Sequence, residues 1–456
     1  MVINMNIIIV GCGKVGSILA DTLTKEGHDI SIIDSNMETV RKLTETLDVK
    51  GIVGNGAIYD VQLEAGVRDA DIFIAVTPDD ELNLLCCLIA KKASSCNTIA
   101  RVRNPDYLSE RGFLKDRLGL STIINPEYEA AAEINRLFCI PSAIEVDTFV
   151  RGKVELLKME LPIGSPIAGR SIMDALGKLS GKVLICAVER DNDVIIPTGS
   201  FVLKSGDEIS FVTSRKDAEV FFKKAGLDVG RIKRVVIAGG GRITYYLVKM
   251  LCEYGFRAKV IEKDKKRCDY LSSIFPSSVV VINSDATDQQ VLHEEGIENA
   301  DGFASLVDLD EENIMLSMYV KDNSKAKVVT KVNNQNLNPI IDKLDIGSVI
   351  SPKQITKEMI LSYVRALENS QGSNVQTLYN IVNNKVEALE FYARSESSVT
   401  GVELSELELK DGLLICCISR NGKTIIPNGM TTIEKGDTVI VVTTLKGLND
   451  LKDIVK

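Results

Sequence analysis

The feature that most constrains the fold is a glycine-rich motif close to the N-terminus. An apolar strand pattern at 5–10 leads into the sequence G-x-G-x-x-G, and a helical pattern at 17–26 and a second strand pattern at 29–33 follow. An acidic residue closes the unit. This order predicts a βαβ unit that binds a dinucleotide. The motif consists of Gly11, Cys12, Gly13, Lys14, Val15 and Gly16, and the acidic residue is Asp34, followed by Ser35.

The three glycines of the motif have separate roles. Gly11 permits a tight turn, Gly13 lets backbone N–H groups approach a pyrophosphate, and Gly16 allows the helix to pack close to the strand. The helix N-terminus presents unpaired N–H groups to the phosphates. Asp34 would accept hydrogen bonds from the adenosine ribose, and its charge would repel the 2′-phosphate of NADP(H). We therefore predict an NAD(H) site. The alternative is a βαβ unit whose glycines serve packing only.

The same pattern returns in the second half of the chain. Gly239 lies 228 residues after Gly11 (239 − 11), and Glu262 lies 228 residues after Asp34 (262 − 34). A smaller unit of β-hairpin patterns follows each copy and repeats as well. The period far exceeds that of solenoid repeats, so the sequence predicts two tandem copies of a large unit and a small unit.

Strand and helix patterns alternate within each large unit. The strand patterns of the first unit lie at 5–10, 29–33, 50–53, 71–76 and 98–102. Parallel strands joined by helices predict an α/β fold with two Rossmann-like doubly wound sheets, each followed by a small α+β domain. We place the Rossmann-like units at 1–125 and 229–350, and the linker helices with their small domains at 126–228 and 351–456.

The linker helices have their own start signals. A proline after a polar residue precedes helical patterns at 127–137 and 353–366, and proline is favoured in the first helical turn. We expect each helix to carry the chain from its Rossmann-like unit to the small domain. A polar stretch at 368–375 is expected to be a solvated loop.

Ligands of a doubly wound sheet bind beyond the carboxyl ends of its strands. Several residues of the first unit fall near such ends, and we predict that they complete the dinucleotide site: Asn55, Gly56, Thr77, Asp80, Asn83 and Arg101. The corresponding residues of the second unit form a second predicted nucleotide site: Gly239, Gly241, Arg242, Ile243, Glu262, Asp285 and Ala286.

The second site departs from the first at two positions. Thr244 replaces the third glycine, and Val307 stands where the first unit has Thr77. We interpret the cations that follow Glu262 as a solvated helix start; they are Lys263, Lys265, Lys266 and Arg267. In the first unit, Arg101 and Arg103 form a pair that either reads phosphate charge, bridges subunits or is structural.

Composition excludes several functions. A net charge of −9 argues against nucleic acid and anionic membranes as general partners, and no apolar run approaches the ~20 residues of a membrane span. The 10 cysteines form no C-x-x-C pattern, so we expect them to be reduced and buried. The only histidines, His28 and His293, have no nucleophile beside them in the sequence. We predict neither a metal site nor a catalytic centre.

The order of these parts resembles the TrkA-type peripheral subunit of the Trk potassium-uptake system, with tandem RCK (KTN) domains. The resemblance covers essentially the whole chain. It rests on Gly11, Gly13, Gly16, Asp34, Asp79, Asp80, Asn83, Asn125, Pro126, Glu127, Ile195, Ile196, Pro197, Gly206 and Asp207. It implies a cytosolic, non-enzymatic subunit that is peripheral at the inner face of the cell membrane.

The resemblance also implies ligands and partners. NAD(H) is expected at the first Rossmann-like unit and ATP or ADP at the second. The chain is expected to associate into a dimer or ring and to gate a membrane potassium-transporting subunit of the TrkH or TrkG type.

Two other functions remain open. An NAD-dependent oxidoreductase needs a proton donor or acceptor beside the nicotinamide, and the two histidines are poorly placed for that role. A regulator of another ion transporter would respond to ligand binding in the same way but would act on a different partner.

Overall fold

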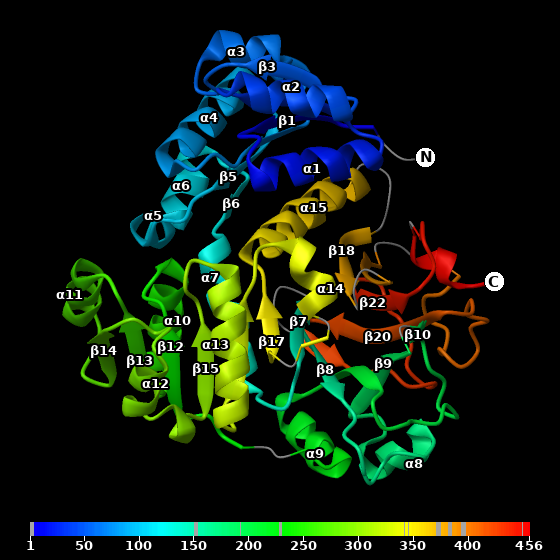
Figure 1. Ribbon diagram of the computed structural model, residues 1–456. Helices are drawn as coiled ribbons and strands as arrows, with labels where there is room; N and C mark the ends of the chain where they lie inside the picture. The colour runs from blue at the N-terminus through cyan, green and yellow to red at the C-terminus, as the bar shows by residue number, and fades with distance from the viewer. Residues whose placement is uncertain are drawn as a thin grey trace.

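Two parallel and two antiparallel sheets alternate along the chain in this computed structural model (Figure 1). The alternation confirms the predicted fold class. Each six-stranded parallel sheet is followed by a five-stranded antiparallel sheet. The structure describes residues 4–149, 154–191, 193–227, 230–341, 343–344, 346–370, 375–381, 385–393, 398–448 and 450–456.

The first Rossmann-like sheet has the strand order β3-β2-β1-β4-β5-β6, and all its described pairs are parallel. The order reverses between β1 and β4, so the loops after these two strands diverge at a switch point where ligands bind. The strands are β1 (Asn6–Val10), β2 (Asp29–Asp34), β3 (Lys50–Val53), β4 (Ile72–Ala75), β5 (Asn97–Arg101) and β6 (Thr122–Ile124). The predicted strands are confirmed to within one residue, and β6 was not predicted.

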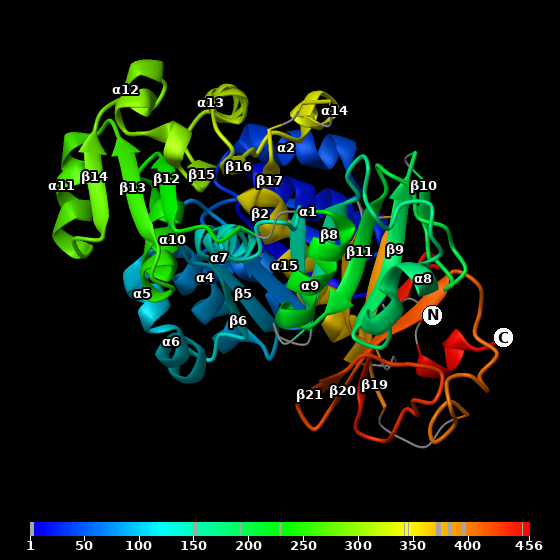
Figure 2. The same ribbon diagram turned by 90° about the horizontal axis from the view of Figure 1, so that it is seen from below.

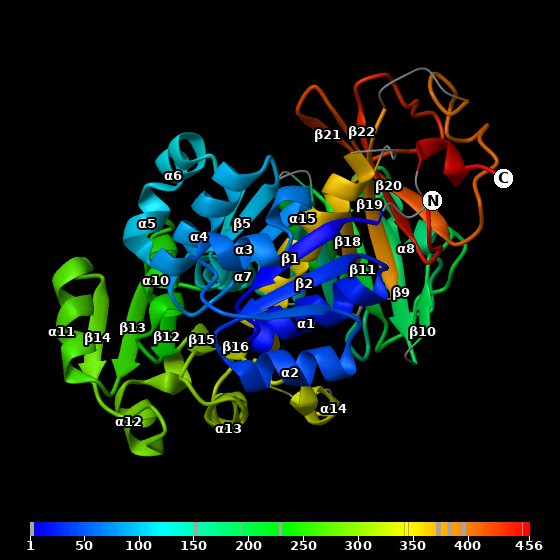
Figure 3. The ribbon, with the colours of Figure 1, turned by 90° about the horizontal axis from the view of Figure 1, so that it is seen from above.

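Helices cover both faces of this sheet (Figure 3). The central strands are buried on both faces, which explains why they are continuous apolar runs instead of alternating ones. The helices are α1 (Lys14–Lys25), α2 (Met37–Thr46), α3 (Tyr59–Glu64), α4 (Asp80–Ala93), α5 (Pro105–Ser109) and α6 (Arg111–Leu118). Helix α1 begins at Lys14 and not at Ser17 as predicted, because Gly13 is its N-cap and the end of the motif forms its first turn.

The second Rossmann-like sheet repeats the first, with the order β14-β13-β12-β15-β16-β17. Its strands are β12 (Arg234–Ala238), β13 (Arg257–Glu262), β14 (Val279–Asn283), β15 (Gly302–Ser305), β16 (Lys327–Lys331) and β17 (Ser348–Ile350). Its helices are α10 (Arg242–Glu253), α11 (Lys265–Ile274), α12 (Gln289–Glu294), α13 (Asp310–Asn323) and α14 (Asn338–Ile341).

The two small domains also share one topology, with the orders β10-β9-β11-β8-β7 and β21-β20-β22-β19-β18. Their sheets pack side by side (Figure 2), and a buried core joins them. The first comprises β7 (Glu145–Phe149), β8 (Val154–Glu160), α8 (Ile172–Leu176), β9 (Val183–Arg190), β10 (Asp193–Ile195), β11 (Glu208–Thr213) and α9 (Arg215–Ala225). The second comprises β18 (Val375–Ile381), β19 (Val386–Tyr392), β20 (Leu413–Arg420), β21 (Lys423–Ile425) and β22 (Thr438–Thr443).

The linker helices exchange partners between the two halves. Helix α7 (Pro126–Cys139) leaves the first Rossmann-like unit and packs on the second, where Ile134 and Phe138 share a core with Leu247 of α10. Helix α15 (Pro352–Ser370) leaves the second unit and packs on the first, where Ile360 joins the core of α1. Figure 1 shows α15 beside α1 and α7 beside α10. The two Rossmann-like units are therefore held together by each other's following helix.

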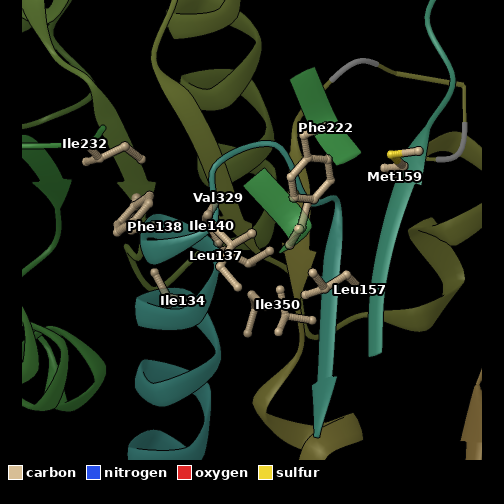
Figure 4. Close-up of a cluster of buried hydrophobic side chains, with 14 of the residues drawn as sticks. Ile134, Leu137, Phe138, Ile140, Leu157, Met159, Phe222, Ile232, Val329 and Ile350 are labelled. Carbon is tan, nitrogen blue, oxygen red and sulfur yellow. The ribbon is translucent and has the colours of Figure 1, made fainter. Parts of the chain in front are cut away.

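The end of α7 is the place where three parts of the molecule meet (Figure 4). The cluster combines side chains of α7, of the second Rossmann-like unit and of the first small domain. Its labelled members are Ile134, Leu137, Phe138, Ile140, Leu157, Met159, Phe222, Ile232, Val329 and Ile350. Nearby, Ser348 Oγ donates to Ile144 O at 2.7 Å, which fixes the chain as it leaves α7.

One predicted loop is wrong in part. Helix α15 continues to Ser370, so 368–370 are helical, and β18 begins at Val375. Residues 371–374 lie outside the described part of the chain. The apolar face that docks on the first unit extends the helix beyond what its polar C-terminal sequence suggested.

The cysteine prediction is confirmed in the main. In the described residues all 10 cysteines are free, and all except Cys139 and Cys252 are buried. Burial raises the pKa of the Cys12 thiol to about 12. None of the described helices is long and apolar enough to cross a bilayer.

The helix exchange leads to a stability prediction. Ile134→Ala on α7 and Ile360→Ala on α15 each remove a fully buried side chain, and we expect each to lower the free energy of unfolding by about 2–5 kcal/mol. The matched control is Ile163→Ala, at a loop residue that is 97% exposed, with an expected change within about 0.5 kcal/mol. Urea denaturation gives the three values. Equal values for the core and control variants would contradict the packing of the linker helices.

Candidate nucleotide-binding sites

The first glycine-rich turn has the geometry that its sequence predicts. Gly11 has φ +90°, and an added Cβ would lie 2.8 Å from Thr77 N. A Cβ on Gly16 would lie 2.0 Å from Gly11 O, which shows how closely α1 approaches the turn. In contrast, a Cβ on Gly13 would have no atom within 4 Å, and no described side chain caps α1. The space beside Gly13 is therefore open and the start of α1 is not capped by a described side chain, as the approach of a phosphate requires.

Asp34 braces this turn from the end of β2. Its Oδ2 accepts a hydrogen bond from Cys12 N at 2.7 Å, and its Oδ1 accepts one from Asn36 N at 2.8 Å. A carboxylate has about four acceptor positions, so Asp34 retains capacity for ribose hydroxyls. Ser35 next to it is exposed. The side chains of Cys12 and Val15 belong to the core under the turn, which leaves their backbone to face a ligand.

Asn83 is a positioning residue at the switch point. It is fully buried, and its Oδ1 accepts from Thr77 N and Thr77 Oγ1, both at 2.8 Å. Its Nδ2 donates to Thr77 O at 3.0 Å and to Arg101 O at 2.9 Å. These bonds use both donors and both acceptor positions of the amide. Asn83 therefore orders the residues predicted beside it at the strand ends.

Arg101, Arg103 and Asp80 tie the loops after β4 and β5 together. Arg101 Nη2 donates to Thr77 O and Arg103 Nη2 donates to Pro78 O, both at 2.7 Å. Asp80 Oδ2 accepts from the backbone N–H groups of Arg103 and Asn104, both at 2.8 Å. Burial, and then the charge of Arg103, lower the pKa of Arg101. In this structure both arginines bond to backbone carbonyls of the loop after β4.

The loop after β3 forms another edge of the first site. Asn55 is exposed, and its Oδ1 accepts from Ala57 N at 2.9 Å. Gly56 is buried, and an added Cβ would lie 2.4 Å from Val10 Cγ1. The loop can approach β1 this closely only because Gly56 has no side chain.

The second glycine-rich turn repeats the brace of the first. Glu262 Oε2 accepts from Gly240 N at 2.6 Å, and its Oε1 accepts from Asp264 N at 2.7 Å. Gly239 has φ +96°, and a Cβ on Gly241 would meet open space. Glu262 thus occupies the structural place of Asp34.

Arg267 distinguishes the second turn from the first. Its Nε donates to Gly240 O at 2.5 Å and its Nη2 donates to Gly241 O at 3.1 Å. Its guanidinium lies over the ring of Tyr270, 5.0 Å from the centroid. Burial lowers the pKa of Arg267. The interpretation of this residue as part of a solvated helix start was therefore wrong, because the packing of α11 brings it onto the turn.

The remaining residues of the second site hold positions equivalent to those of the first. Thr244 is fully buried and its Oγ1 donates to Gly239 O at 2.6 Å, where the first unit has the close approach of Gly16. Asn313 Oδ1 accepts from Val307 N at 2.9 Å, as Asn83 does from Thr77. Ile243 and Ala286 are buried, Arg242 is exposed, and Asp285 Oδ1 accepts from Thr287 N at 2.9 Å.

Tyr246 of α10 connects the second unit to the first. Its hydroxyl accepts from Asn125 Nδ2 at 2.9 Å and donates to Arg103 O at 3.1 Å. Glu127, at the start of α7, lies 3.9 Å from Arg103 Nη1 (measured from Oε1). Burial raises the pKa of Glu127, opposed by its own backbone N–H and by nearby arginines that include Arg242. The start of α7 is thus shared by the two units.

Lys353, at the start of α15, is a residue that sequence reasoning missed. Burial, and next the charge of Lys14, lower the pKa of Lys353, so these two cations lie near each other at the first turn. The sequence could have indicated Lys353, because Pro352-Lys353 of the second copy aligns with Pro126-Glu127 of the first. The exchange of linker helices brings a cation to the first site and a carboxylate to the second.

No group of three or more His, Cys, Asp or Glu side chains in the described ranges is arranged to hold a metal ion. His28 is buried, and its Nδ1 accepts from Met5 N at 3.4 Å. His293 contacts Glu298 and Tyr319. Both histidines therefore have structural neighbours away from the glycine-rich turns.

Comparison with known proteins identifies the same two-part repeat. Residues 7–126 and 235–352 match the TrkA-N domain, and residues 156–226 and 389–456 match the TrkA-C domain. The chain is 34% identical over 451 residues to a Trk system potassium uptake protein TrkA homolog of Archaeoglobus fulgidus, covering 99% of this chain and 100% of that protein. It is 33% identical over 440 residues to the Trk system potassium uptake protein TrkA of Halomonas elongata, covering 96% and 95%.

Solved structures share the fold. The crystal structure of the GsuK RCK domain superposes with a TM-score of 0.63 at 18% identity, covering 96% of this chain and 92% of that one. The GsuK channel bound to NAD gives the same TM-score and identity, covering 97% of this chain and 77% of that one. With two TrkA-N and two TrkA-C domains in alternation, the chain belongs to the TrkA family of Trk system potassium uptake proteins.

Proposed function

We propose that this chain is a cytosolic regulatory subunit that binds NAD(H) at its first glycine-rich turn and thereby gates a membrane potassium transporter. The observation that carries the proposal is the uncapped start of α1, which faces open space beside the carboxylate of Asp34. Relatives named as potassium uptake proteins, and a similar channel bound to NAD, support the ligand and the process.

The first turn suits a dinucleotide diphosphate. Lys14 and Lys353 add positive charge to the helix dipole at the start of α1. Asp34 suits an unmodified ribose and disfavours a 2′-phosphate. We therefore propose NAD(H), and not NADP(H), as the ligand.

The second turn suits an adenine mononucleotide, ATP or ADP. Glu262 offers the ribose contact, and Arg242 and Arg267 offer cations beside the start of α10. A phosphate at this turn would draw Arg267 away from the carbonyls of Gly240 and Gly241. A related channel structure bound to ADP, with a TM-score of 0.50, supports this class of ligand.

Ligand binding can regulate a partner only if the ligand binds two conformations with different affinity. Tyr246 and the start of α7 give the two sites a shared contact, since Tyr246 bonds to Asn125 and to the loop of Arg103. We propose that this contact couples the sites.

Exposed apolar side chains support self-association into a ring. Leu85 on α4 and Met315 on α13 are equivalent in the two units, and both are exposed. Phe113 on α6 and Ile340 on α14 are exposed on the following segments. Exposed apolar patches of this kind mark protein interfaces. A second copy of the chain fits them, because each chain presents the same face twice. The ring would lie at the inner face of the membrane against a potassium-transporting subunit of the TrkH or TrkG type.

The direct test of the function is co-purification with such a membrane subunit, with and without NADH and ATP, followed by potassium flux in vesicles. We expect a complex whose flux changes with NADH. A complex that forms but conducts equally in all conditions would contradict ligand-dependent gating, and turnover of NADH with carbonyl substrates would favour an oxidoreductase.

Reciprocal carboxylate variants test the ligand assignment. Asp34→Ala removes the ribose acceptor and the brace on Cys12, so we expect NADH affinity to fall at least tenfold while ADP affinity is unchanged. Glu262→Ala should have the reverse effect. Isothermal titration calorimetry measures both affinities. Unchanged NADH affinity in Asp34→Ala would refute this site.

A variant at the Tyr246 hydroxyl tests the coupling between the two nucleotide sites. Tyr246→Phe removes the bonds to Asn125 and Arg103, so we expect NADH and ATP to bind with nearly unchanged separate affinities but a reduced effect on each other. Coupling energies are typically about 1–3 kcal/mol. The neighbouring Tyr245→Phe is the control. If both variants retain the wild-type ratio of NADH affinities with and without ATP, the contact does not couple the sites.

Assembly is tested with two equally exposed methionines. Met315 and Met173 are both 70% exposed, but only Met315 lies on the proposed ring face. Met315→Glu places a charge in an apolar interface and should shift the chain to smaller species in light scattering, whereas Met173→Glu should not. An intact assembly in Met315→Glu would exclude this face.

A further inference from the structure

A cavity of about 1120 Å³ opens at the edge of the second Rossmann-like sheet that is opposite its glycine-rich turn. It lies between the end of α7, helix α9 of the first small domain and the starts of β12 and β13. Arg234 and Arg257, the first residues of these two strands, line it. Because doubly wound sheets bind ligands at the carboxyl ends of their strands, this cavity is separate from the sites described above.

The floor of the cavity is apolar and aromatic. Phe138, Phe222, Ile232 and Phe256 line it and are buried. Figure 4 shows three of them, Phe138, Phe222 and Ile232, near one another where three parts of the molecule meet. Tyr254 stands on the rim and is 61% exposed. Because those four side chains are almost completely covered, Tyr254 is the aromatic side chain of the lining that is open to the face of a flat ring.

The rim of the cavity carries positive charge that the described chain does not neutralise. Arg231, Lys233 and Arg257 line the cavity, are exposed, and have no side-chain partner among the described residues. Arg234, in contrast, is paired with Asp301 at 3.0 Å. The other carboxylate that lines the cavity is that of Glu219. The excess of cations is local, since the whole chain has a net charge of −9.

The positive charge continues in a neighbouring cavity. A second cavity, of about 540 Å³, shares Arg231 and Arg234 with the first and is also lined by Lys325 and Lys327. Lys327 Nζ donates to Ala143 O at 2.5 Å, and burial lowers the pKa of Lys327 to about 8. Clustered cations beside low-dielectric walls focus a positive potential that attracts anions.

We propose that the larger cavity binds a small molecule that combines an aromatic ring with two or more phosphates. The ring would lie against Tyr254, and the phosphates would contact Arg231, Lys233 and Arg257 at the rim. Arginine forks suit phosphate oxygens, and the volume accommodates a ligand of nucleotide size. Since residues of both α9 and β13 line the cavity, the bound ligand would contact the first small domain and the second Rossmann-like unit. This inference does not rest on the proposed function.

A tryptophan reporter tests this site alone, because the chain contains no tryptophan. Tyr254→Trp places the reporter on the rim. Titration with inorganic tripolyphosphate should give a saturable change in its emission. In the same background, Arg231→Gln with Arg257→Gln should weaken binding at least tenfold. The matched control, Lys42→Gln with Lys92→Gln, removes two exposed cations elsewhere and should leave binding unchanged.

Two further titrations test the role of the ligand's aromatic ring and the location of the binding site. ATP should bind the reporter variant at least tenfold more tightly than tripolyphosphate, because Trp at position 254 keeps an exposed aromatic face for the base; equal affinity would overturn the role of the aromatic side chain at the rim. The reporter response should persist in Asp34→Ala and Glu262→Ala, and its loss there would place the signal at the glycine-rich turns. No saturable response to either probe, or an unaltered response in the arginine double variant, would overturn the proposal.

A measurement without the reporter keeps the test independent of Tyr254. Equilibrium dialysis of tripolyphosphate against the unmodified chain and against Arg231→Gln with Arg257→Gln should show one bound equivalent fewer in the double variant. Equal binding by the two folded proteins, verified by circular dichroism, would contradict the site.

Discussion

The structure depends on the docking of each linker helix on the other half of the chain. Ile134 and Phe138 of α7 are buried against the second Rossmann-like unit, and Ile360 and Val364 of α15 against the first. Burial of one such side chain contributes about 1.5–3 kcal/mol, so a helix that places several of them across the halves makes the halves interdependent. A ligand that moves one Rossmann-like unit would therefore also move the linker helix that packs on it, and that helix follows the other unit in the sequence.

The two glycine-rich turns illustrate how a duplicated site diverges while its scaffold stays. Asp34 and Glu262 brace their turns through equivalent backbone bonds. The difference lies in what covers the turn. The first is open in front of Gly13, whereas Arg267 bonds to the carbonyls of Gly240 and Gly241 at the second. One fold thus has an open turn and a turn that Arg267 covers.

The sequence predicted those features that local patterns determine. The strands, the glycine turn and its acidic brace depend on neighbours within a few residues or on one repeated motif. Arg267, Lys353 and Tyr246 escaped prediction because tertiary packing places them: α11 brings Arg267 to its turn, and the helix exchange brings Lys353 to the other half. Asn83 was predicted as a ligand contact, and in the structure its amide bonds to Thr77 and Arg101. Asn83 lies near the start of α4, next to the strand ends, and these bonds to its amide are not apparent from the sequence.

The central claim is that a ligand at the first turn reaches the other half of the chain through the exchanged linker helices α7 and α15. Hydrogen–deuterium exchange with and without NADH measures this directly. The account predicts slower exchange in the turn before α1 and also in the first turns of α15 and α7, which contact the two sites. Protection confined to the first Rossmann-like unit, with α7 and α15 unchanged, would contradict it.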